Sequence, residues 1–241
     1  DPFRLYVTLE PCSRFGRTPP CLIRLQRYNQ LQEVVFLHRD PTQNSLAELQ
    51  KVCTVSQGNL SSFFLEGFLR RVQRNRPRLF FKIACSKDGF IAPFPLQRFP
   101  ISGRQAMAFV QLLRSRMSAI AVGGRTIQID RPRLNYRPPS ESDLPRPAAR
   151  KGSAIFLDTL FDHADLLLTQ QASLLQPLRI GCLDPSRPVD QVFLREQENL
   201  SGSYVSFDSR RPAAEFLSFV ADLGCSDLMV EGGAGLLSYL K

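Results

Sequence analysis

Two apolar runs in the middle of the chain end in residues that suit ligand chemistry. The run Leu79–Ala84 is broken only by Lys82, which predicts a buried strand that carries one functional cation. The run Ala119–Val122 predicts a second buried strand, and Gly123-Gly124 follows it directly. Because paired glycines after a strand let a ligand phosphate approach the backbone closely, we expect an anionic ligand group near these strand ends.

A third apolar run near the end of the chain leads into another group of candidate residues. Leu228–Val230 is followed by Glu231, Gly232 and Gly233, which predicts a buried strand, a glycine-rich turn and then a helix. A helix N-terminus presents free N–H groups, so these glycines are candidate contacts for a cofactor phosphate. The alternative is a plain strand–turn–helix connection without a ligand.

Helices must position these strands. The pattern predicts a helix over Gly103–Met117 with Ser102 as its N-cap, and the apolar spacing gives its buried face as Ala106, Phe109, Val110 and Leu113. Nearer the start of the chain, Leu22–Leu31 also reads as a helix. The segment 74–78 is polar, basic and broken by Pro77, so we place a boundary there between residues 1–76 and 77–241.

Length, composition and charge limit the function classes. The chain has 241 residues, of which 43% are hydrophobic, and its apolar runs are far shorter than the roughly 20 residues of a membrane helix. No leader-like segment opens the sequence, so we expect a cytoplasmic protein without membrane contact. The chain carries 31 basic and 22 acidic residues, a net charge of +9, which alone would allow nonspecific nucleic-acid binding. However, the Arg residues do not gather on one helix, so nucleic acid is not an expected partner, and the sequence leaves a homo-oligomer open.

The middle of the chain resembles the reductase domain of the bifunctional riboflavin-biosynthesis deaminase/reductase family. That family's pattern is a Lys, three residues, Ser-x-Asp-Gly-x-Ile-Ala, a helical Arg, Val-Gly-x-x-Thr, Asp-x-Pro-x-Leu and an Arg. The matching positions here are Lys82, Ser86, Asp88, Gly89, Arg114, Gly123, Thr126, Asp130, Pro132, Leu134 and Arg137. The resemblance implies an α/β fold similar to dihydrofolate reductase for residues 77–241, with the family's last strands missing from this sequence.

The resemblance also implies an activity and a set of contacts. The family reduces the ribosyl side chain of 5-amino-6-(5-phosphoribosylamino)uracil with NADPH, a small phosphoribosyl pyrimidine substrate. Substrate would contact Lys82, Arg114, Leu134, Arg137 and Glu231. NADPH would contact Ala84, Thr126, Asp130, Thr159, Gly232 and Gly233. Within this set, Arg114 would meet the ribose phosphate, because a planar guanidinium fork suits a phosphate monoester.

Residues 1–76 resemble part of the cytidine-deaminase-like zinc domain of the same family. Leu5–Leu9 would be a strand, Pro11-Cys12 would start the next helix, Cys12 and Cys21 would bind Zn²⁺, and Arg17 would lie in the substrate loop. Zinc deaminases need a His-x-Glu element as well, and it is absent from these 241 residues. The only histidines are His38 and His163, and neither stands where the motif requires it. Because two thiolates make a poor zinc site, zinc is expected only if a missing N-terminal segment exists. The alternative is two free thiols.

Several positions depart from the family pattern. Arg14 replaces a His, Arg98 replaces a substrate-contacting Ser, Pro100 replaces a cofactor-contacting residue, and Met107 replaces an Arg. These departures support an alternative hypothesis, in which the chain is a degenerate, non-catalytic homologue that acts as a binding or scaffold protein. NADPH titration separates the two hypotheses, because a scaffold should bind no NADPH saturably.

Overall fold

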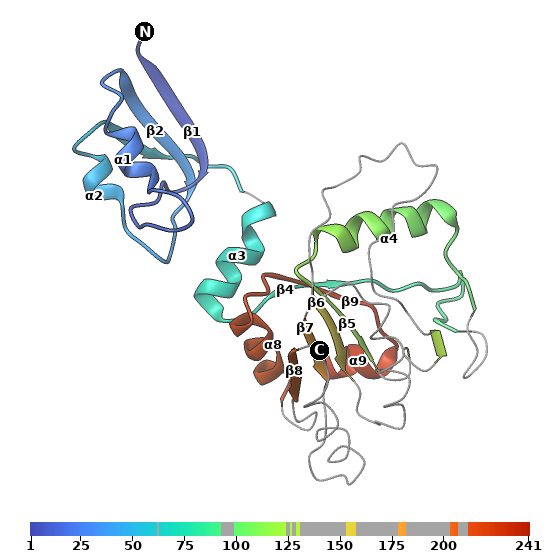
Figure 1. Ribbon diagram of the computed structural model, residues 1–241. Helices are drawn as coiled ribbons and strands as arrows, with labels where there is room; N and C mark the ends of the chain where they lie inside the picture. The colour runs from blue at the N-terminus through green and yellow to red at the C-terminus, as the bar shows by residue number, and fades with distance from the viewer. Residues whose placement is uncertain are drawn as a thin grey trace. The chain divides into compact units, whose positions relative to one another are not determined.

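The chain folds into two compact units, Asp1–Arg76 and Pro77–Lys241. The computed structural model (Figure 1) describes residues 1–61, 63–92, 99–123, 126, 129–130, 153–157, 178–181, 203–206 and 212–241. For 153–157, 178–181 and 203–206 the backbone alone is described. We call the two units unit 1 and unit 2 and describe each by itself.

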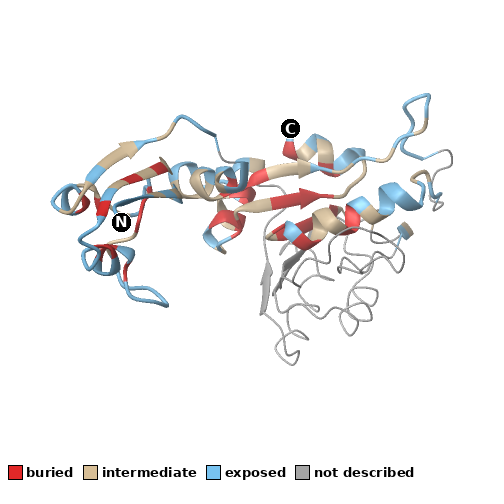
Figure 2. Cartoon of the chain, turned by 90° about the horizontal axis from the view of Figure 1, so that it is seen from above, coloured by how far each residue is buried: buried red, intermediate tan, exposed pale blue. Residues whose placement is uncertain are grey.

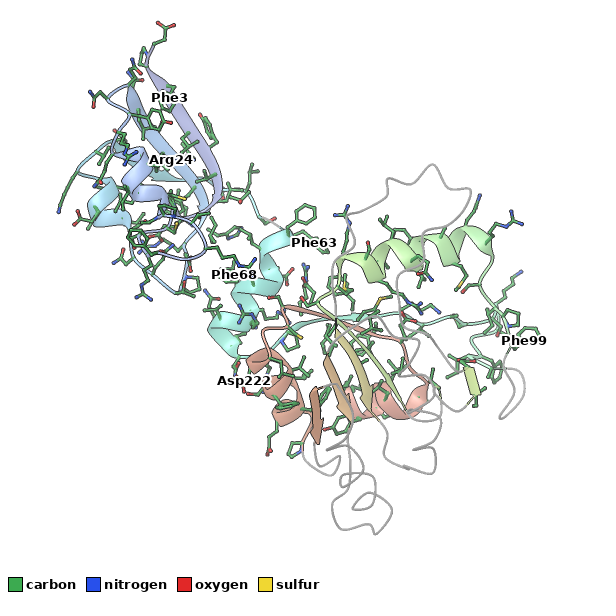
Figure 3. All side chains as sticks on the ribbon, in the orientation of Figure 1. Phe3, Arg24, Phe63, Phe68, Phe99 and Asp222 are labelled. Atoms are coloured by element: carbon green, nitrogen blue, oxygen red, sulfur yellow. The ribbon has the colours of Figure 1, made fainter. Side chains whose placement is uncertain are left out.

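Unit 1 is built on a three-stranded parallel sheet in the order β1-β2-β3. Its elements are β1 (Phe3–Leu9), α1 (Cys21–Leu25), β2 (Leu31–His38), α2 (Leu46–Leu49), β3 (Thr54–Gln57) and α3 (Phe63–Arg74). Leu22, Leu25, Leu31, Val34 and Leu49 form its buried core. Two aromatic side chains of unit 1 make further contacts. Phe3 packs edge-on against Tyr28, with ring centroids 6.0 Å apart. Within α3, the Arg71 guanidinium lies 5.8 Å from the centre of the Phe68 ring; Phe3 and Phe68 are labelled in Figure 3.

Two helix predictions for unit 1 are wrong. No helix starts at Pro11-Cys12, because the segment up to Pro20 is interrupted by Gly16 and by the Pro19-Pro20 pair, which break helical hydrogen bonding. The helix predicted over Leu22–Leu31 ends at Leu25. Beyond it, Tyr28 N–H donates to the Leu25 carbonyl at 3.1 Å, a three-residue turn that leads Leu31 into β2.

Unit 2 contains a six-stranded parallel sheet in the order β4-β9-β5-β6-β7-β8. Its elements are β4 (Arg78–Phe81), α4 (Arg104–Arg116), β5 (Ala119–Gly123), β6 (Ser153–Leu157), β7 (Leu178–Gly181), β8 (Ser203–Ser206), α8 (Ala213–Asp222), β9 (Asp227–Val230) and α9 (Ala234–Leu240). The α/β prediction is therefore confirmed. The last described strand, β9, lies between β4, at the edge of the sheet, and β5, so residues from both ends of unit 2 meet on neighbouring strands.

Helices cover both faces of this sheet. Figure 1 shows α4 on one side, and α8 and α9 on the other. Ala119, Ala121, Leu228 and Val230 join the core formed with α8 and α9, so the alternate residues of β5 and β9 point towards α4. Ala119–Val122 of β5 and Leu228–Val230 of β9 are all buried, and buried residues are drawn in red in Figure 2.

The position of α4 is as predicted, but its cap and buried face differ from the prediction. Gly103, not Ser102, is the N-cap, and no side chain caps the helix. Phe109 is 55% exposed, whereas Val110, Gln111 and Ser115 are buried. Arg114 lies on the same buried stripe as Val110 and Gln111, and its guanidinium reaches the Glu231 carboxylate at the end of β9. Among the described helices, none is long and apolar enough to span a membrane.

Candidate functional site

Three strand ends of unit 2 come together on one edge of its sheet. Since β4, β9 and β5 are adjacent and parallel, Lys82, Glu231 and Gly123 lie at the same carboxyl edge. The backbone hydrogen bonds between these strands continue one residue beyond the strand ends. Lys82 N–H donates to the Val230 carbonyl at 2.9 Å, and Glu231 N–H donates to the Ala121 carbonyl at 2.8 Å. In parallel α/β sheets ligands bind outside this edge, so it is the candidate site.

A bidentate ion pair joins α4 to this edge. Arg114 Nε donates to Glu231 Oε1 and Arg114 Nη2 donates to Glu231 Oε2, both at 2.6 Å. The two side chains are only 7% and 11% exposed. Paired N–H bonds from a guanidinium to a carboxylate are among the strongest in proteins. The structure thus brings together two predicted substrate contacts, but it joins them to each other.

Lys82 is the neighbouring cation at the site. The register pairs Phe81 with Val230, so Lys82 and Glu231, one residue further along each strand, lie side by side on the face that α4 covers. Lys82 is half-buried. Among the described ion pairs none involves Lys82.

The two glycines after Glu231 have different surroundings. A Cβ on Gly232 would lie 2.8 Å from Leu236 Cδ2 and 3.0 Å from Leu236 Cβ, so Gly232 packs closely against α9 and a larger residue would force Leu236 to shift. Gly233 is the N-cap of α9, and a Cβ there would meet nothing within 4 Å. The backbone at Gly233 therefore borders open space, which a ligand could enter.

The other predicted contacts of unit 2 are only partly described. Ala84 follows β4 and is half-buried. Thr126 and Asp130 follow β5; Thr126 is half-buried and Asp130 is exposed. Leu134, Arg137, Thr159 and Arg98 lie outside the described residues. Of the departures from the family pattern, Met107 is 39% exposed, and Pro100 and, in unit 1, Arg14 are also exposed.

Cys12 and Cys21 lie together after β1 in unit 1. Their Sγ atoms are 3.5 Å apart, and Cys21 N–H donates to Cys12 Sγ at 3.2 Å. Burial raises the pKa of the Cys21 thiol. No third His, Cys, Asp or Glu joins them among the residues that the structure describes. Because zinc sites have four ligands, at least three of them from protein, this pair does not by itself fit the metal.

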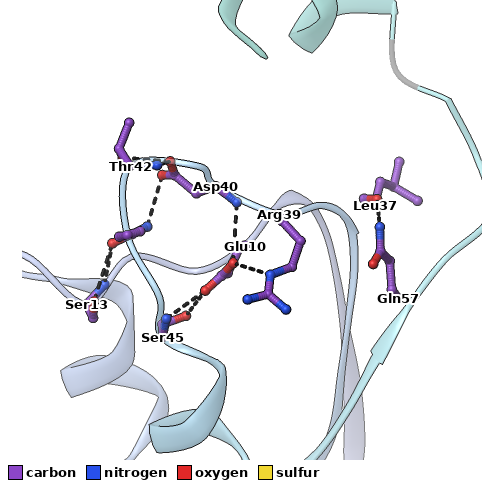
Figure 4. Close-up of polar contacts among 9 residues, drawn as sticks. Glu10, Ser13, Leu37, Arg39, Asp40, Thr42, Ser45 and Gln57 are labelled. Carbon is purple, nitrogen blue, oxygen red and sulfur yellow. Dashed lines mark hydrogen bonds and ion pairs between the residues drawn. The ribbon is translucent and has the colours of Figure 1, made fainter. Parts of the chain in front are cut away.

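Sequence reasoning missed a buried carboxylate two residues before Cys12 in the chain. Glu10 follows β1 and its side chain has no exposed surface. Its carboxylate accepts bonds from Ser45 N–H at 2.6 Å and Ser45 Oγ at 2.9 Å, and Asp40 N–H donates at 3.3 Å. Arg39 Nε lies 3.3 Å away as its cation (Figure 4). The sequence pattern that could have revealed Glu10 is an acidic residue directly after an apolar strand.

The network extends from Glu10 to the thiol-bearing segment. Asp40 accepts bonds from Thr42 N–H at 2.9 Å, Thr42 Oγ1 at 2.6 Å and Gln43 Nε2 at 3.0 Å. The other amide atom of Gln43, Oε1, accepts from Ser13 N–H at 2.9 Å (Figure 4). Ser13 directly follows Cys12 in the loop after β1, and Gln43 lies in the loop after β2. The hydrogen bond between Ser13 and Gln43 therefore joins the two loops. The predicted substrate contact Arg17 is exposed in this loop.

Residues 77–240 match the family model described as the RibD C-terminal domain. The riboflavin biosynthesis protein RibD of Chlamydia muridarum is 30% identical over 254 residues, which cover 97% of this chain and 63% of the relative. RibD of Escherichia coli is 36% identical over 140 residues, which cover 55% of this chain and 38% of that relative.

Two solved structures also match most of this chain. Acinetobacter baumannii RibD (form 1) superposes with a TM-score of 0.73 at 26% identity, over 95% of this chain and 62% of that chain. A deaminase/5-amino-6-(5-phosphoribosylamino)uracil reductase from Thermotoga maritima superposes with a TM-score of 0.70 at 21% identity, over 97% of this chain and 63% of that chain. The first two curated relatives are longer than this chain, which spans 63% and 62% of them.

Proposed function

Through residues 77–240 the chain belongs to the RibD C-terminal domain family, and from this premise we propose that unit 2 is a reductase of riboflavin biosynthesis. Its substrate would be 5-amino-6-(5-phosphoribosylamino)uracil and its reductant NADPH. The observation that carries the proposal is the meeting of Lys82, the Arg114–Glu231 pair and Gly233 at the carboxyl edge of β4, β9 and β5. This edge is where parallel sheets bind such ligands.

The reaction reduces the carbonyl carbon of the opened ribosyl side chain to an alcohol. When bound, NADPH supplies the hydride, and a proton on the former carbonyl oxygen completes the ribityl product. The protein contributes orientation and charge. Lys82 and Glu231 meet the substrate, together with the predicted contacts Leu134 and Arg137.

The residues at the edge fit a nicotinamide nucleotide. The open space beside Gly233 lets a phosphate reach the backbone, whereas Gly232 serves packing first. Ala84, Thr126, Asp130 and Thr159 remain proposed cofactor contacts, since they follow strands of the same parallel sheet.

For unit 1 we infer a part of a cytidine-deaminase-like domain, supported by the thiol pair after β1. Since Cys12 and Cys21 do not make a zinc site by themselves, no deamination step is derived from them. A contact between Arg17 and a pyrimidine substrate stays a prediction, as does a cytoplasmic location. Metal analysis of the purified protein tests the zinc proposal: bound Zn²⁺ that is lost in Cys12→Ser supports it, and a zinc-free protein contradicts it.

The reductase proposal is tested by NADPH oxidation with the named substrate and by NADPH titration. We expect saturable binding and turnover, with turnover strongly reduced in Lys82→Met. Lys87→Met is the matched control, because Lys87 is an exposed lysine just downstream of β4. A folded protein that shows neither saturable NADPH binding nor turnover would refute the reductase and favour the non-catalytic alternative, which nothing in the described fold or in the comparisons supports.

A further inference from the structure

The thiols of Cys12 and Cys21 are held close together by the backbone around them. Their Sγ atoms are 3.5 Å apart, and Cys21 N–H donates to Cys12 Sγ at 3.2 Å. Leu22 N–H donates to the Cys12 carbonyl at 3.1 Å. Two backbone N–H groups at the start of α1 therefore bind residue 12, so the contact between the two sulfurs does not depend on the thiols alone.

Both ends of this contact are anchored in unit 1. On one side, Ser13 N–H donates to Gln43 Oε1 at 2.9 Å, which fixes the residue next to Cys12. On the other side, Leu22 is part of the buried core next to Cys21. Two reactive groups that a fold holds together react with each other far faster than the same groups free in solution. A disulfide has an S–S length of about 2.05 Å, so the sulfurs must approach by about 1.5 Å, which is within the reach of side-chain rotation.

The pair is also open to a small oxidant. Cys21 is exposed and Cys12 is half-buried, whereas Cys225 is buried. Cys53 is half-buried and packs against the core of unit 1. Cys85 is exposed in unit 2 and serves below as the reference thiol. Cys12 and Cys21 therefore combine a neighbouring sulfur with access from solvent.

The surroundings of the pair favour a bond between the sulfurs over a zinc site. Among the residues with described positions, no third His, Cys, Asp or Glu joins the two thiols, and a zinc site takes at least three protein ligands. Glu10, two residues before Cys12, is already bound to Ser45 and paired with Arg39. Two close thiols without a third ligand instead suit two-electron oxidation to a disulfide.

We propose that Cys12 and Cys21 form a reversible disulfide when unit 1 meets a peroxide, and that this bond is a redox switch of the loop between them. Cys12 Sγ attacks one oxygen of hydrogen peroxide, because the N–H of Cys21 stabilises negative charge on that sulfur. The O–O bond breaks, Cys12 becomes a sulfenic acid, and the other oxygen leaves as water. Cys21 Sγ then attacks the sulfenic sulfur, the S–O bond breaks, and a second water leaves. The two thiols lose two electrons and two protons, which the peroxide takes up, and a dithiol reductant reverses the bond by exchange.

The disulfide changes what this loop can do. It closes a ring from residue 12 to residue 21, which contains the exposed Arg14, Phe15 and Arg17, and so restricts their motion relative to α1. It also occupies both sulfurs, so the oxidised pair has no thiolate to offer to a metal ion. Both thiols belong to unit 1, so the switch is independent of the reductase proposed for unit 2.

Peptide mapping after mild oxidation tests the switch. The purified protein is reduced, freed of reductant, treated with an equimolar amount of hydrogen peroxide, alkylated and digested with trypsin. Cleavage at the arginines places Cys12 in residues 5–14 and Cys21 in residues 18–24, so a disulfide joins two separate peptides. We expect these linked peptides, lighter than their sum by two hydrogen atoms, to form about tenfold faster than the exposed Cys85 loses its thiol. Dithiothreitol should separate them again.

Matched variants distinguish the pair from the other cysteines. Cys21→Ser should abolish the linked peptides and leave Cys12 as a sulfenic acid that dimedone labels. Cys85→Ser is the control, because it removes an exposed thiol of unit 2 and should leave the link unchanged. The mapping of the unsubstituted protein decides the proposal even if Cys21→Ser does not fold.

Three results would overturn the inference. The first is that Cys12 and Cys21 lose their thiols no faster than Cys85. The second is a link from either of them to a second copy of the chain or to Cys182, which lies outside the described residues. The third is Zn²⁺ that stays on the pair and shields both thiols from peroxide. Metal analysis identifies this third case, in which the zinc proposal stands and the disulfide switch fails.

Discussion

Glu10 shows how a single buried charge can organise two loops. Its carboxylate has no exposed surface and accepts bonds from Ser45 and from the Asp40 backbone, with Arg39 as its cation. A buried carboxylate is tolerated only when donors and a cation compensate for the lost hydration. Ser45 precedes α2 but does not cap it with its side chain, because its hydroxyl is bonded to Glu10. The geometry of the loops after β1 and β2 thus depends on this one carboxylate.

Replacement of Glu10 by Gln should therefore destabilise unit 1. The Gln side chain keeps the size of Glu but points an N–H₂ group at one of these donors, which leaves a buried donor unsatisfied and Arg39 without its anion. We expect a loss of about 2–3 kcal/mol in the free energy of unfolding. Denaturant titration measures the change.

Glu48 provides the matched control for Glu10. Its ion pair with Lys51 is exposed, with 49% and 69% of the side chains accessible, so Glu48→Gln should change stability by less than about 1 kcal/mol. Equal effects of the two substitutions would contradict the role assigned to Glu10.

Individual residues were predictable where the local pattern carries the information. Lys82 interrupts an apolar strand, and Gly233 follows one, so both could be placed at strand ends from the sequence. The partner of Arg114 could not, because Glu231 lies 117 positions away and the sequence does not reveal which helix face meets which strand. Glu10 was missed for the same reason: its donors come from the loop after β2.

The turn between β9 and α9 places two adjacent glycines in different environments. Gly232 packs against Leu236, which is itself buried at 7% exposure. Gly233 caps α9 with an ordinary extended backbone (φ −77°) and borders open space. One glycine therefore serves the fold, and the other is available to a ligand.

Alanine substitutions should separate these two roles. Gly232→Ala brings a Cβ to 2.8 Å from Leu236 Cδ2, and overpacking against a buried side chain should cost about 1–3 kcal/mol of unfolding free energy. Gly233→Ala should cost less than about 1 kcal/mol, the effect of a poorer N-cap, but it should weaken NADPH binding under the proposed function. Unfolding and NADPH titrations of both variants measure this, and a Gly233→Ala protein with unchanged NADPH affinity would remove Gly233 from the cofactor site.

Elements were predictable when their own pattern determined them. The strands at Ala119–Gly123 and Asp227–Val230 are almost continuously apolar, as expected of parallel strands buried on both faces. The buried face of α4 was not predictable, because apolar spacing favoured Phe109 whereas the structure buries the polar residues Gln111 and Ser115 instead. In unit 1, Leu31 has the same apolar character in a helix or a strand, and the turn at Tyr28 decides for the strand.

The whole of unit 2 depends on contacts between residues far apart in the sequence. β4 begins the unit and β9 nearly ends it, yet they are adjacent, and Arg78 Nε lies 2.7 Å from Asp227 Oδ1 across them. The reductase-like α/β fold expected for this region is confirmed by the family model and by the RibD structure. The strand order could be expected only through the family resemblance, because hydrophobic periodicity does not reveal which strands are neighbours.

Removal of β9 should therefore unfold unit 2 and spare unit 1. A chain that ends at Gly224 lacks β9 and α9, so β4 loses its described sheet partner and the core loses Leu228, Val230, Leu236 and Leu240. Each such side chain contributes about 1.5–3 kcal/mol when buried, and the sum approaches the 5–15 kcal/mol typical of a whole domain. Unit 1 keeps its own core around Leu22, Val34 and Leu49, so one unfolding transition should remain.

Calorimetry of the shortened chain, beside one that lacks only the exposed Lys241, tests this dependence. The control should retain both transitions and the NADPH binding proposed above, since Lys241 lies beyond the last helix and outside the core. Persistence of the unit 2 transition in the shortened chain would mean that β4 and β5 hold together without the strand between them. In that case β9 would be an addition to the sheet of unit 2 rather than the strand that joins β4 to β5, and the Arg114–Glu231 pair would serve the site without supporting the fold.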